Sequence, residues 1–147
     1  MKLGIVGTGM IVRDLMQMLH QVPVQSLAIY GRDLAKAQQL ADECGIPLVF
    51  NDYAALLHAD IDTVYIALPN HLHFAFARQA LTAGKHVIME KPITSNSHEL
   101  QTLRDLAKTR GLILIEAVTV HYLPAYLAMR EKMAELGEIK IVSLNYS

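Results

Sequence analysis

Short apolar runs alternate along this chain with longer segments in which apolar residues recur every three or four positions. Such runs, bounded by glycine, proline or polar residues, are typical of buried parallel strands, and the longer segments are typical of helices with one apolar face. The runs predict six strands, at residues 3–6, 27–30, 47–50, 63–67, 86–89 and 112–115. Strands that alternate with helices predict a doubly wound α/β fold with a parallel sheet, and we expect the strand order 3-2-1-4-5-6.

The segments between the strands predict helices whose apolar sides face the sheet. One helix is predicted to begin at Met10. A short helix is predicted after Asp52, which caps it, and a further helix is predicted with Ser95 or Ser97 as its cap. The residues predicted to face the sheet from the first two helices are Met10, Ile11, Leu15, Met18, Leu19, Leu34, Ala37, Leu40, Ala41 and Cys44.

The last part of the chain departs from this alternation. A helix is predicted over 125–136, ended by Gly137, and the segment 138–146 then alternates apolar and polar residues as a strand does. We expect this strand to lie outside the main sheet and, because it is too apolar for an exposed edge, to pair with a second copy of the chain or to remain unstructured. A homo-oligomer is therefore expected.

Composition restricts the class of protein. The 147 residues are 52% hydrophobic and 18% charged, which suits one folded domain. The net charge of −1 gives no basic surface for nucleic acid, and no apolar run approaches the roughly 20 residues of a membrane span, so neither partner is expected. A strand that begins at Lys2 leaves no room for a signal peptide, and Cys44 is the only cysteine, so we expect a cytoplasmic protein.

Gly7-Thr8-Gly9 joins the first strand to the first helix. Strand, Gly-x-Gly and helix form the context of a dinucleotide-binding fingerprint, because the glycines let a pyrophosphate approach the backbone and the helix N-terminus offers free N–H donors. Val12 stands where the motif has its third glycine, and we expect it to hold the helix slightly farther from the strand. On these residues alone, an ordinary turn that uses glycine for its backbone freedom explains the pattern equally well.

Unusual local sequences follow five of the predicted strands. They lie at 7–9, 31–32, 68–73, 90–92 and from Glu116 onward. In a doubly wound sheet the carboxyl ends of the strands meet at one edge, where ligands bind. The sequence therefore predicts a single ligand crevice at this edge.

Gly31-Arg32 ends the second strand, where an NAD-binding chain usually places an acidic residue that accepts from the ribose 2′-hydroxyl. An arginine there suits a 2′-phosphate through a forked, charge-assisted contact. We therefore expect NADP to be the favoured cofactor, with NAD possible. The alternative is a solvated Arg32, with Asp33 only capping the next helix.

Four strings, in this order, resemble the Gfo/Idh/MocA oxidoreductase family. They are Gly-Thr-Gly-Met-Ile at 7–11, Leu-Pro-Asn-His-Leu-His at 68–73, Gly-Lys-His-Val-Ile-Met-Glu-Lys-Pro at 84–92 and Glu-Ala-x-x-x-x-Tyr-x-Pro at 116–124. The resemblance implies a dinucleotide-binding Rossmann domain over 1–120. It also implies hydride transfer between a nicotinamide cofactor and a hydroxyl or carbonyl of a small polyol- or sugar-like substrate. A non-catalytic nucleotide-binding sensor is the alternative, which the Glu90-Lys91-Pro92 string disfavours.

The resemblance, together with the Gly31-Arg32 pair, implies roles for individual residues. The residues expected to bind the cofactor are Gly7, Thr8, Gly9, Met10, Ile11, Gly31, Arg32, Leu68, Pro69, Asn70, His73, Glu90 and Lys91. The segment 7–11 would hold the pyrophosphate, and Pro69, Asn70 and His73 would line the nicotinamide side. Lys91 and Glu90 would be catalytic, Lys91 as a cation that stabilises the developing alkoxide and Glu90 by placing it. A surface lysine after a strand is the plain alternative.

The resemblance covers only the N-terminal part of the family. Residues 121–147 would be a connecting helix and the first strand of a second domain for substrate and oligomerisation, so we expect the 147-residue chain alone to be inactive. Val120, His121 and Leu123 stand where many relatives carry an aromatic residue, an arginine and a histidine, which weakens the case for sugar-type substrate contacts.

No metal site is predicted. Two histidines that are two positions apart, His71 and His73, do not share a helix face, and no cysteine or acidic cluster completes a ligand set. His20, His58 and His98 are expected on the surface.

Overall fold

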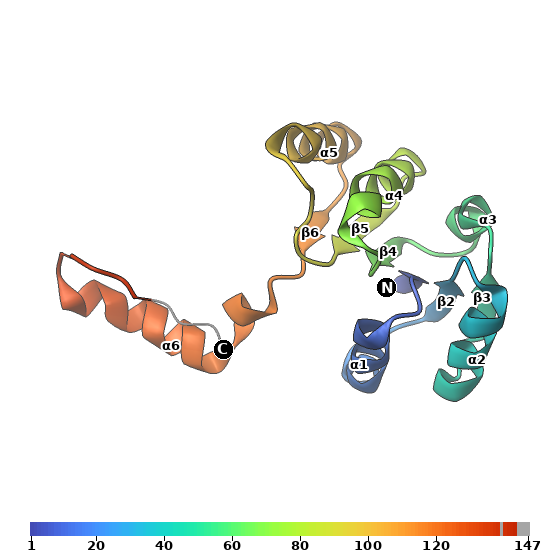
Figure 1. The fold of residues 1–147 in the computed structure, drawn as a ribbon, viewed down its shortest axis with the longest axis horizontal. Coiled ribbons are helices and arrows are strands. Elements are labelled where there is room, and N and C mark those ends of the chain that lie inside the picture. The colour runs from blue at the N-terminus through green and yellow to red at the C-terminus, as the bar shows by residue number, and fades with distance from the viewer. Residues whose placement is uncertain (139, 144–147) are drawn as a thin grey trace. The chain divides into compact units, whose positions relative to one another are not determined.

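The computed structural model describes residues 1–138 and 140–143. The chain divides into two compact units, Met1–Ala117 and Val118–Ser147. The first unit holds a six-stranded sheet in the order β3-β2-β1-β4-β5-β6, in which every neighbouring pair is parallel (Figure 1). The strands are β1 (Lys2–Val6), β2 (Ser26–Tyr30), β3 (Leu48–Phe50), β4 (Thr63–Ile66), β5 (His86–Met89) and β6 (Leu114–Glu116). The predicted doubly wound α/β fold and its strand order are confirmed.

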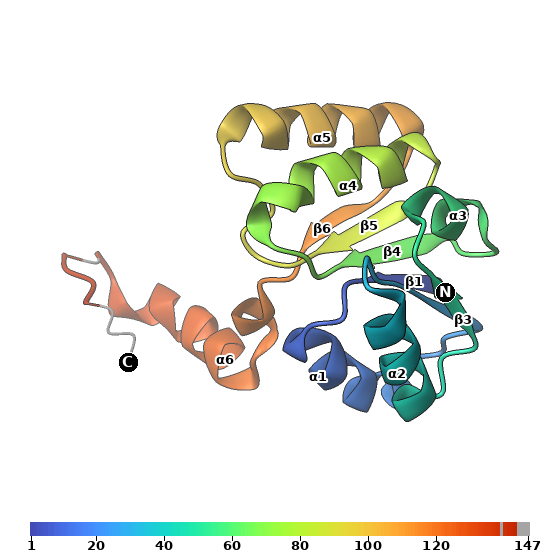
Figure 2. The same ribbon diagram turned by 45° about the vertical axis from the view of Figure 1, so that its right-hand side comes forward.

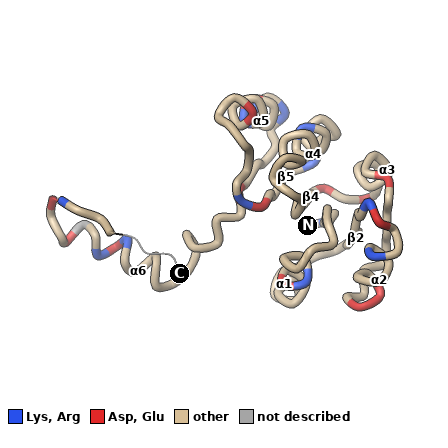
Figure 3. Tube along the Cα trace, viewed as in Figure 1, with Lys and Arg blue, Asp and Glu red and all other residues tan. Residues whose placement is uncertain are grey.

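Helices cover both faces of this sheet. They are α1 (Met10–Met18), which continues as the 3-10 turn η1 (Leu19–Gln21), α2 (Leu34–Cys44), α3 (Tyr53–His58), α4 (Asn70–Thr82) and α5 (Ser97–Arg110). Figure 2 shows α4 and α5 packed together on one face, with α1 and α2 on the other. Basic and acidic residues both occur along α2 and α5 (Figure 3).

Each face of the sheet has its own hydrophobic core, because successive side chains of a strand point to opposite faces. In β1, Leu3 and Ile5 belong to the core beneath α1 and α2, and Val6 belongs to the core beneath α3, α4 and α5. The central strand β4 is buried along its whole length. This burial on both faces explains why the strands are continuous apolar runs.

The face that α1 turns toward the sheet differs from the predicted one. Met10 is 80% exposed and Met18 60% exposed, and Ile11 is exposed too, whereas Val12 is fully buried. The buried stripe runs through Val12, Leu15, Met16 and Leu19. These positions are three, four and seven residues apart, the spacing of one helix face, so Val12 is a core residue as well as a departure from the glycine motif. Leu34, predicted to face inward from α2, is exposed because it is the first residue of its helix.

The caps of α2 and α3 follow the prediction, and the cap of α5 does not. Asp33 accepts from the Lys36 amide at 3.2 Å, and Asp52 accepts from the Ala54 amide at 2.9 Å. The cap of α5 is Asn96, whose side-chain oxygen accepts from the Glu99 amide at 3.0 Å. Ser97 is already the first helical residue, so the extended backbone that a cap requires falls at Asn96.

The last strand begins two residues later than predicted, at Leu114. The amide of Leu112 donates to the carbonyl of Ala107 at 2.9 Å and closes the end of α5. The amide of Ile113 donates to Nδ1 of His86 at 3.1 Å, a side-chain acceptor in place of a strand carbonyl. Regular pairing with β5 therefore starts only after both amides have been used.

The second unit contains η2 (Thr119–Tyr122), α6 (Pro124–Met133) and η3 (Ala134–Leu136). The predicted helix over 125–136 is present, with its last turn in 3-10 form. Residues 140–143 form no strand, contrary to the prediction for 138–146, and positions 139 and 144–147 lie outside the described residues. An alternating pattern supplies an apolar face but no hydrogen-bond partner, and a strand needs both.

Candidate functional site

A cleft of about 510 Å³ opens at the carboxyl ends of β1, β2 and β4. Seven of the residues expected to bind the cofactor line it: Gly7, Thr8, Gly9, Gly31, Arg32, Leu68 and Pro69. The other expected residues, Met10, Ile11, Asn70, His73, Glu90 and Lys91, are not part of its lining. The structure therefore brings together the turns after three of the five strands named in the crevice prediction, and the segments at 90–92 and from Glu116 onward are not part of this lining.

The turn between β1 and α1 leaves the helix N-terminus open toward this cleft. Gly7 has φ +124°, and a Cβ on it would lie 2.3 Å from the carbonyl oxygen of Ala67, so only glycine lets the turn pack against the end of β4. A Cβ on Gly9 would meet nothing within 4 Å. Gly9 is the N-cap of α1 and brings no side-chain acceptor, and the first turn has no acidic residue. Free N–H groups and the positive end of the helix dipole thus face the cleft.

The part of the cleft that follows β2 contains a tightly enclosed glycine, Gly31, and two cationic side chains, Arg32 and Lys36. A Cβ on Gly31 would lie 2.8 Å from Cγ2 of Thr8 and 2.9 Å from Cβ of Ala37. Arg32 and Lys36 both line the cleft, and Lys36 lies 3.8 Å from the Asp33 carboxylate. The sequence analysis did not predict Lys36 as a cleft residue. Its position four residues after Arg32, in the first turn of α2, could have indicated that it lies beside Arg32.

Aromatic side chains form an apolar part of the cleft that the sequence reasoning also missed. Tyr30 and Phe76 line it, with ring centroids 5.9 Å apart. Tyr53 packs on both rings and donates from its hydroxyl to the carbonyl of Phe76 at 3.0 Å. Burial raises the pKa of Tyr53, so this hydroxyl remains a donor at neutral pH.

His73 lies beneath the cleft wall and not on it. Its side chain is fully buried in α4, so a ligand in the cleft does not touch the ring. Nε2 is 2.8 Å from the carbonyl oxygen of Leu68, and Nδ1 is 2.8 Å from the carbonyl oxygen of Pro92. The structure thus places the His73 ring against backbone oxygens and outside the cleft lining, and its expected place beside the nicotinamide stays a prediction.

The loop after β5, which carries Glu90 and Lys91, is held by side chains from neighbouring strands. The hydroxyl of Tyr65 on β4 donates to Oε1 of Glu90 at 2.5 Å. Burial, and then the hydrogen bond to Glu90 and its charge, raise the pKa of Tyr65, which keeps the hydroxyl protonated. The amide of Ile93 donates to Oε1 of Glu116 on β6 at 2.9 Å. Lys91 is exposed and forms no ion pair with the part of the chain that the structure describes.

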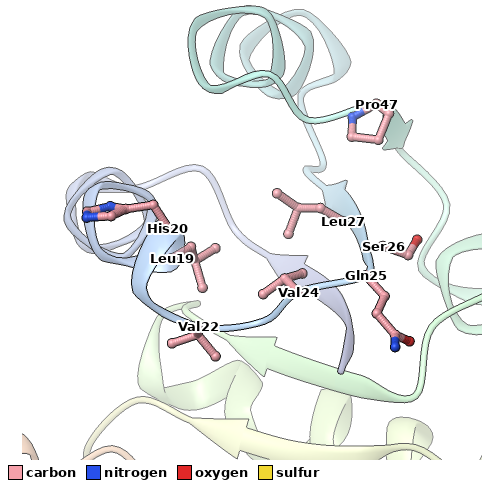
Figure 4. A pocket seen from close by; sticks show the side chains of 8 residues that line it. All are labelled: Leu19, His20, Val22, Val24, Gln25, Ser26, Leu27 and Pro47. Carbon is pink, nitrogen blue, oxygen red and sulfur yellow. The ribbon is translucent and has the colours of Figure 1, made fainter.

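Other parts of the described chain bring together fewer residues that could bind or transform a ligand. A pocket of about 460 Å³ opens near the amino end of β2, and Figure 4 shows Leu19 and Leu27 facing each other across it. Its lining is largely aliphatic, with His20 as its one ionisable side chain. Within residues 1–138 and 140–143, no three His, Cys, Asp or Glu side chains gather as a metal site would need. His20, His58 and His98 are exposed, as expected. None of the described helices has the length and apolar character that crossing a membrane requires.

The sequence model of a family described as "Oxidoreductase family, NAD-binding Rossmann fold" matches residues 1–118. The chain belongs to this family, the Gfo/Idh/MocA oxidoreductases. The predicted membership and the Rossmann domain class are confirmed.

Curated relatives of this Gfo/Idh/MocA chain include dehydrogenases that are more than twice its length. D-xylose 1-dehydrogenase (NADP(+)) 2 of Haloferax volcanii is 38% identical over 150 residues, which cover 100% of this chain and 46% of the relative. Trans-1,2-dihydrobenzene-1,2-diol dehydrogenase of Bos taurus is 34% identical, over 97% of this chain and 44% of its own length. The chain thus spans less than half of each.

A solved structure of the same fold carries a cofactor. KijD10, a 3-ketoreductase from Actinomadura kijaniata in complex with NADP and TDP-benzene, superposes with a TM-score of 0.85 at 30% identity. The match covers 92% of this chain and 42% of KijD10. These likenesses support an NAD(P)-binding oxidoreductase domain whose relatives act on sugars and diols.

Proposed function

We propose that this chain is the NADP(H)-binding part of an oxidoreductase that transfers a hydride between the nicotinamide and a hydroxyl or carbonyl of a small polyol- or sugar-like substrate. The observation that carries the proposal is the cleft at the carboxyl rim, which joins the Gly7–Gly9 turn to Arg32 and Lys36. Xylose-like and diol substrates fall within the proposed class, because the relatives include a xylose dehydrogenase and a diol dehydrogenase.

The residues present fit a dinucleotide pyrophosphate. A Cβ added to Gly9 would have no neighbouring atom within 4 Å, so there is open space beside this residue. No side chain caps the N-terminus of α1. A phosphate oxygen there would accept from the N–H groups of Met10 and Ile11 at the start of α1, since the Val12 amide already donates to the Gly9 carbonyl at 3.1 Å. The helix dipole would favour its negative charge. Leu68 and Pro69 would form the opposite wall of the cleft.

The fit also extends to the 2′-phosphate of NADP. Arg32 offers a planar fork of donors and Lys36 a second cation at the same wall. The acidic residue that accepts from the 2′-hydroxyl of NAD has no room at Gly31, because its Cβ would press on Thr8 and Ala37. NADP is accordingly the proposed cofactor, with NAD as the weaker ligand.

Lys91 and Glu90 are the proposed catalytic residues. The cofactor supplies or accepts the hydride, and the protein must stabilise the substrate oxygen on which negative charge develops. The Lys91 ammonium has no described ion-pair partner and is therefore free to donate to that oxygen. Glu90, fixed by the Tyr65 hydroxyl, anchors the backbone next to Lys91. A cytoplasmic location and self-association stay predictions from the sequence.

A cofactor titration tests this proposal. The chain is titrated with NADPH and with NADH while nicotinamide fluorescence is recorded, and NADPH is expected to bind more tightly. Arg32→Ala should narrow the difference by about 1.5–3 kcal/mol, the worth of a hydrogen bond to a charged group. Arg104→Ala, on the exposed side of α5, is the matched control and should change neither affinity. Equal affinities for both cofactors in the unmodified chain would show that Arg32 does not read the phosphate.

A further inference from the structure

Glu116 is the residue at the rim whose role the cleft leaves unexplained. It is the last residue of β6 and begins one of the five unusual segments, but it is not part of the cleft lining. Its side chain is half-buried, and Oε1 accepts from the amide of Ile93 at 2.9 Å. The two residues are 23 positions apart in the sequence, so this bond connects the end of β6 to the loop that follows β5.

The bond closes the base of this loop. In the sheet, Glu116 is the direct partner of Met89, the last residue of β5. The amide of Ala117 donates to the carbonyl of Met89 at 2.8 Å, which holds the two strand ends together. The chain leaves Met89, passes through residues 90–92 and returns at Ile93 to the side chain of Glu116. Both ends of the loop are therefore held by the same residue of β6.

Neighbouring contacts hold the residues on either side of Lys91. Before it, the Glu90 side chain accepts from the hydroxyl of Tyr65 at 2.5 Å. After it, the carbonyl oxygen of Pro92 lies 2.8 Å from Nδ1 of His73. Lys91 itself is exposed. The loop thus presents one exposed cation on a backbone that is anchored before and after it.

We propose that Glu116 is a positioning residue, which closes the loop after β5 and so fixes the backbone from which Lys91 reaches the substrate oxygen. A carboxylate suits this task, because it only accepts hydrogen bonds and its charge strengthens the bond from a backbone N–H. The Lys91 ammonium stands at the end of a long, flexible side chain, so a fixed backbone narrows the positions that it can occupy. The part that concerns Lys91 rests on the proposed function, whereas the closure of the loop rests only on the contacts of Glu116.

The closure is tested in the unmodified chain and two variants, without a cofactor. Glu116→Met keeps the length of the side chain but has no oxygen acceptor, and Glu116→Gln keeps one acceptor oxygen. In Glu116→Met, the amide of Ile93 should exchange about tenfold faster. Nitrogen-15 relaxation should show the order parameter of the Lys91 amide falling from about 0.85 to below about 0.6. Glu116→Gln should bring both values most of the way back.

Two controls separate a local effect from a loss of overall stability. Glu131→Met removes an exposed carboxylate from α6 and should change neither value. The amide of Val64, in the buried strand β4, should keep its protection in every variant, because the loop can open without unfolding the sheet. An order parameter at Lys91 that is unchanged in Glu116→Met would show that Glu116 serves only the turn at Ile93, and would overturn the proposal.

Cofactor addition to the unmodified chain separates this inference from the proposed function. NADPH should shift the resonance of the Lys91 amide, whereas 2′,5′-ADP, which lacks the nicotinamide half, should not. If NADPH leaves that resonance unchanged while Glu116→Met loosens the loop, the proposed role of Lys91 is wrong and the closure stands. If NADPH shifts it and Glu116→Met leaves the loop ordered, the closure is wrong and the proposed function stands.

A second variant keeps the test decisive if Glu116→Met does not fold. Glu116→Asp withdraws the acceptor by shortening the side chain, and it should loosen the Lys91 amide and speed exchange at Ile93 in the same way. An order parameter at Lys91 below about 0.6 in the unmodified chain would refute the closure by itself.

Discussion

At the scale of single residues, two glycines of the cleft have opposite requirements. Gly31 is enclosed, because a Cβ would come within 3 Å of Thr8 and Ala37 side-chain atoms, whereas Gly9 faces open space. A glycine that protects packing and a glycine that admits a ligand look the same in a sequence. A methyl group added at the enclosed glycine would lower stability, whereas one added at the open glycine would obstruct the proposed ligand.

We therefore predict that alanine separates the two roles. Gly31→Ala should lower the free energy of unfolding by about 1–3 kcal/mol, because it overpacks the contact with Ala37. Gly9→Ala, at a backbone φ of −79° that alanine adopts freely, should leave stability almost unchanged and weaken NADPH binding. Urea denaturation and cofactor titration of both variants measure this. Equal loss of stability in the two variants would contradict the assignment of Gly9 to ligand approach.

A second residue-scale prediction concerns pH. Burial raises the pKa of Tyr53, and burial together with the bond to Glu90 raises that of Tyr65. A raised pKa means that the folded state holds the proton more tightly, so the stabilisation is complete below the unfolded pKa of about 10 and is lost as the pH rises beyond it. The free energy of unfolding, measured in urea at increasing alkaline pH, should fall less steeply in Tyr65→Phe. Tyr122→Phe, an exposed site, should leave the slope unchanged.

At the scale of elements, the cap of α5 gives the clearest test. Asn96→Ala should cost about 0.5–2 kcal/mol, because it removes the acceptor for the Glu99 amide. Ser97→Ala is the matched control and should be nearly neutral, since Ser97 is inside the helix. Thermal or urea unfolding of both variants measures the difference. A larger loss in Ser97→Ala would assign the cap to Ser97, one of the two serines that the sequence offered.

The elements also show what the hydrophobic pattern could predict. Strand order and the helix sequence followed from alternation and length, because burial on both faces leaves continuous apolar runs. The face of α1 did not follow, since Val12 drew attention as a missing glycine while Met10 and Ile11, at the rim, counted as core. The start of β6 was also missed, because a side-chain acceptor on His86 took the place of a strand carbonyl.

Some residues of the candidate site were also predictable from the sequence, and others were not. The glycine turns, Arg32 and Pro69 were predictable because each follows a strand directly, and the ends of parallel strands share one edge. Lys36 could have been noticed from its place one helical turn after Arg32, whereas the bond from Tyr65 to Glu90 depends on a contact between side chains far apart in the sequence. The burial of His73 was not predictable either, since spacing along a chain does not tell whether a side chain points into a cleft or beneath it.

At the scale of the whole molecule, we expect cofactor binding and catalysis to be separable. The cleft lies at the ends of β1, β2 and β4, all of which belong to Met1–Ala117, so we expect the proposed cofactor binding to need nothing beyond this unit. The relatives are more than twice as long, and the remaining part of their length has no counterpart in these 147 residues. In the proposed mechanism Lys91 would polarise a substrate oxygen, but on an exposed loop it would neither enclose the substrate nor return its proton from a shielded site.

We therefore predict that residues 1–147 bind NADPH but show negligible turnover of sugars or polyols, as measured by nicotinamide absorbance. Joining the second domain of a full-length relative should restore turnover. In that longer chain Lys91→Ala should depress kcat far more than cofactor affinity, because the lysine acts on the reacting oxygen and the affinity resides in the cleft. Lys108→Ala, exposed on α5, is its matched control. Ordinary turnover by the 147 residues alone would refute the need for a second domain. An unchanged kcat in the Lys91→Ala longer chain would remove Lys91 from the mechanism while leaving the cofactor site intact.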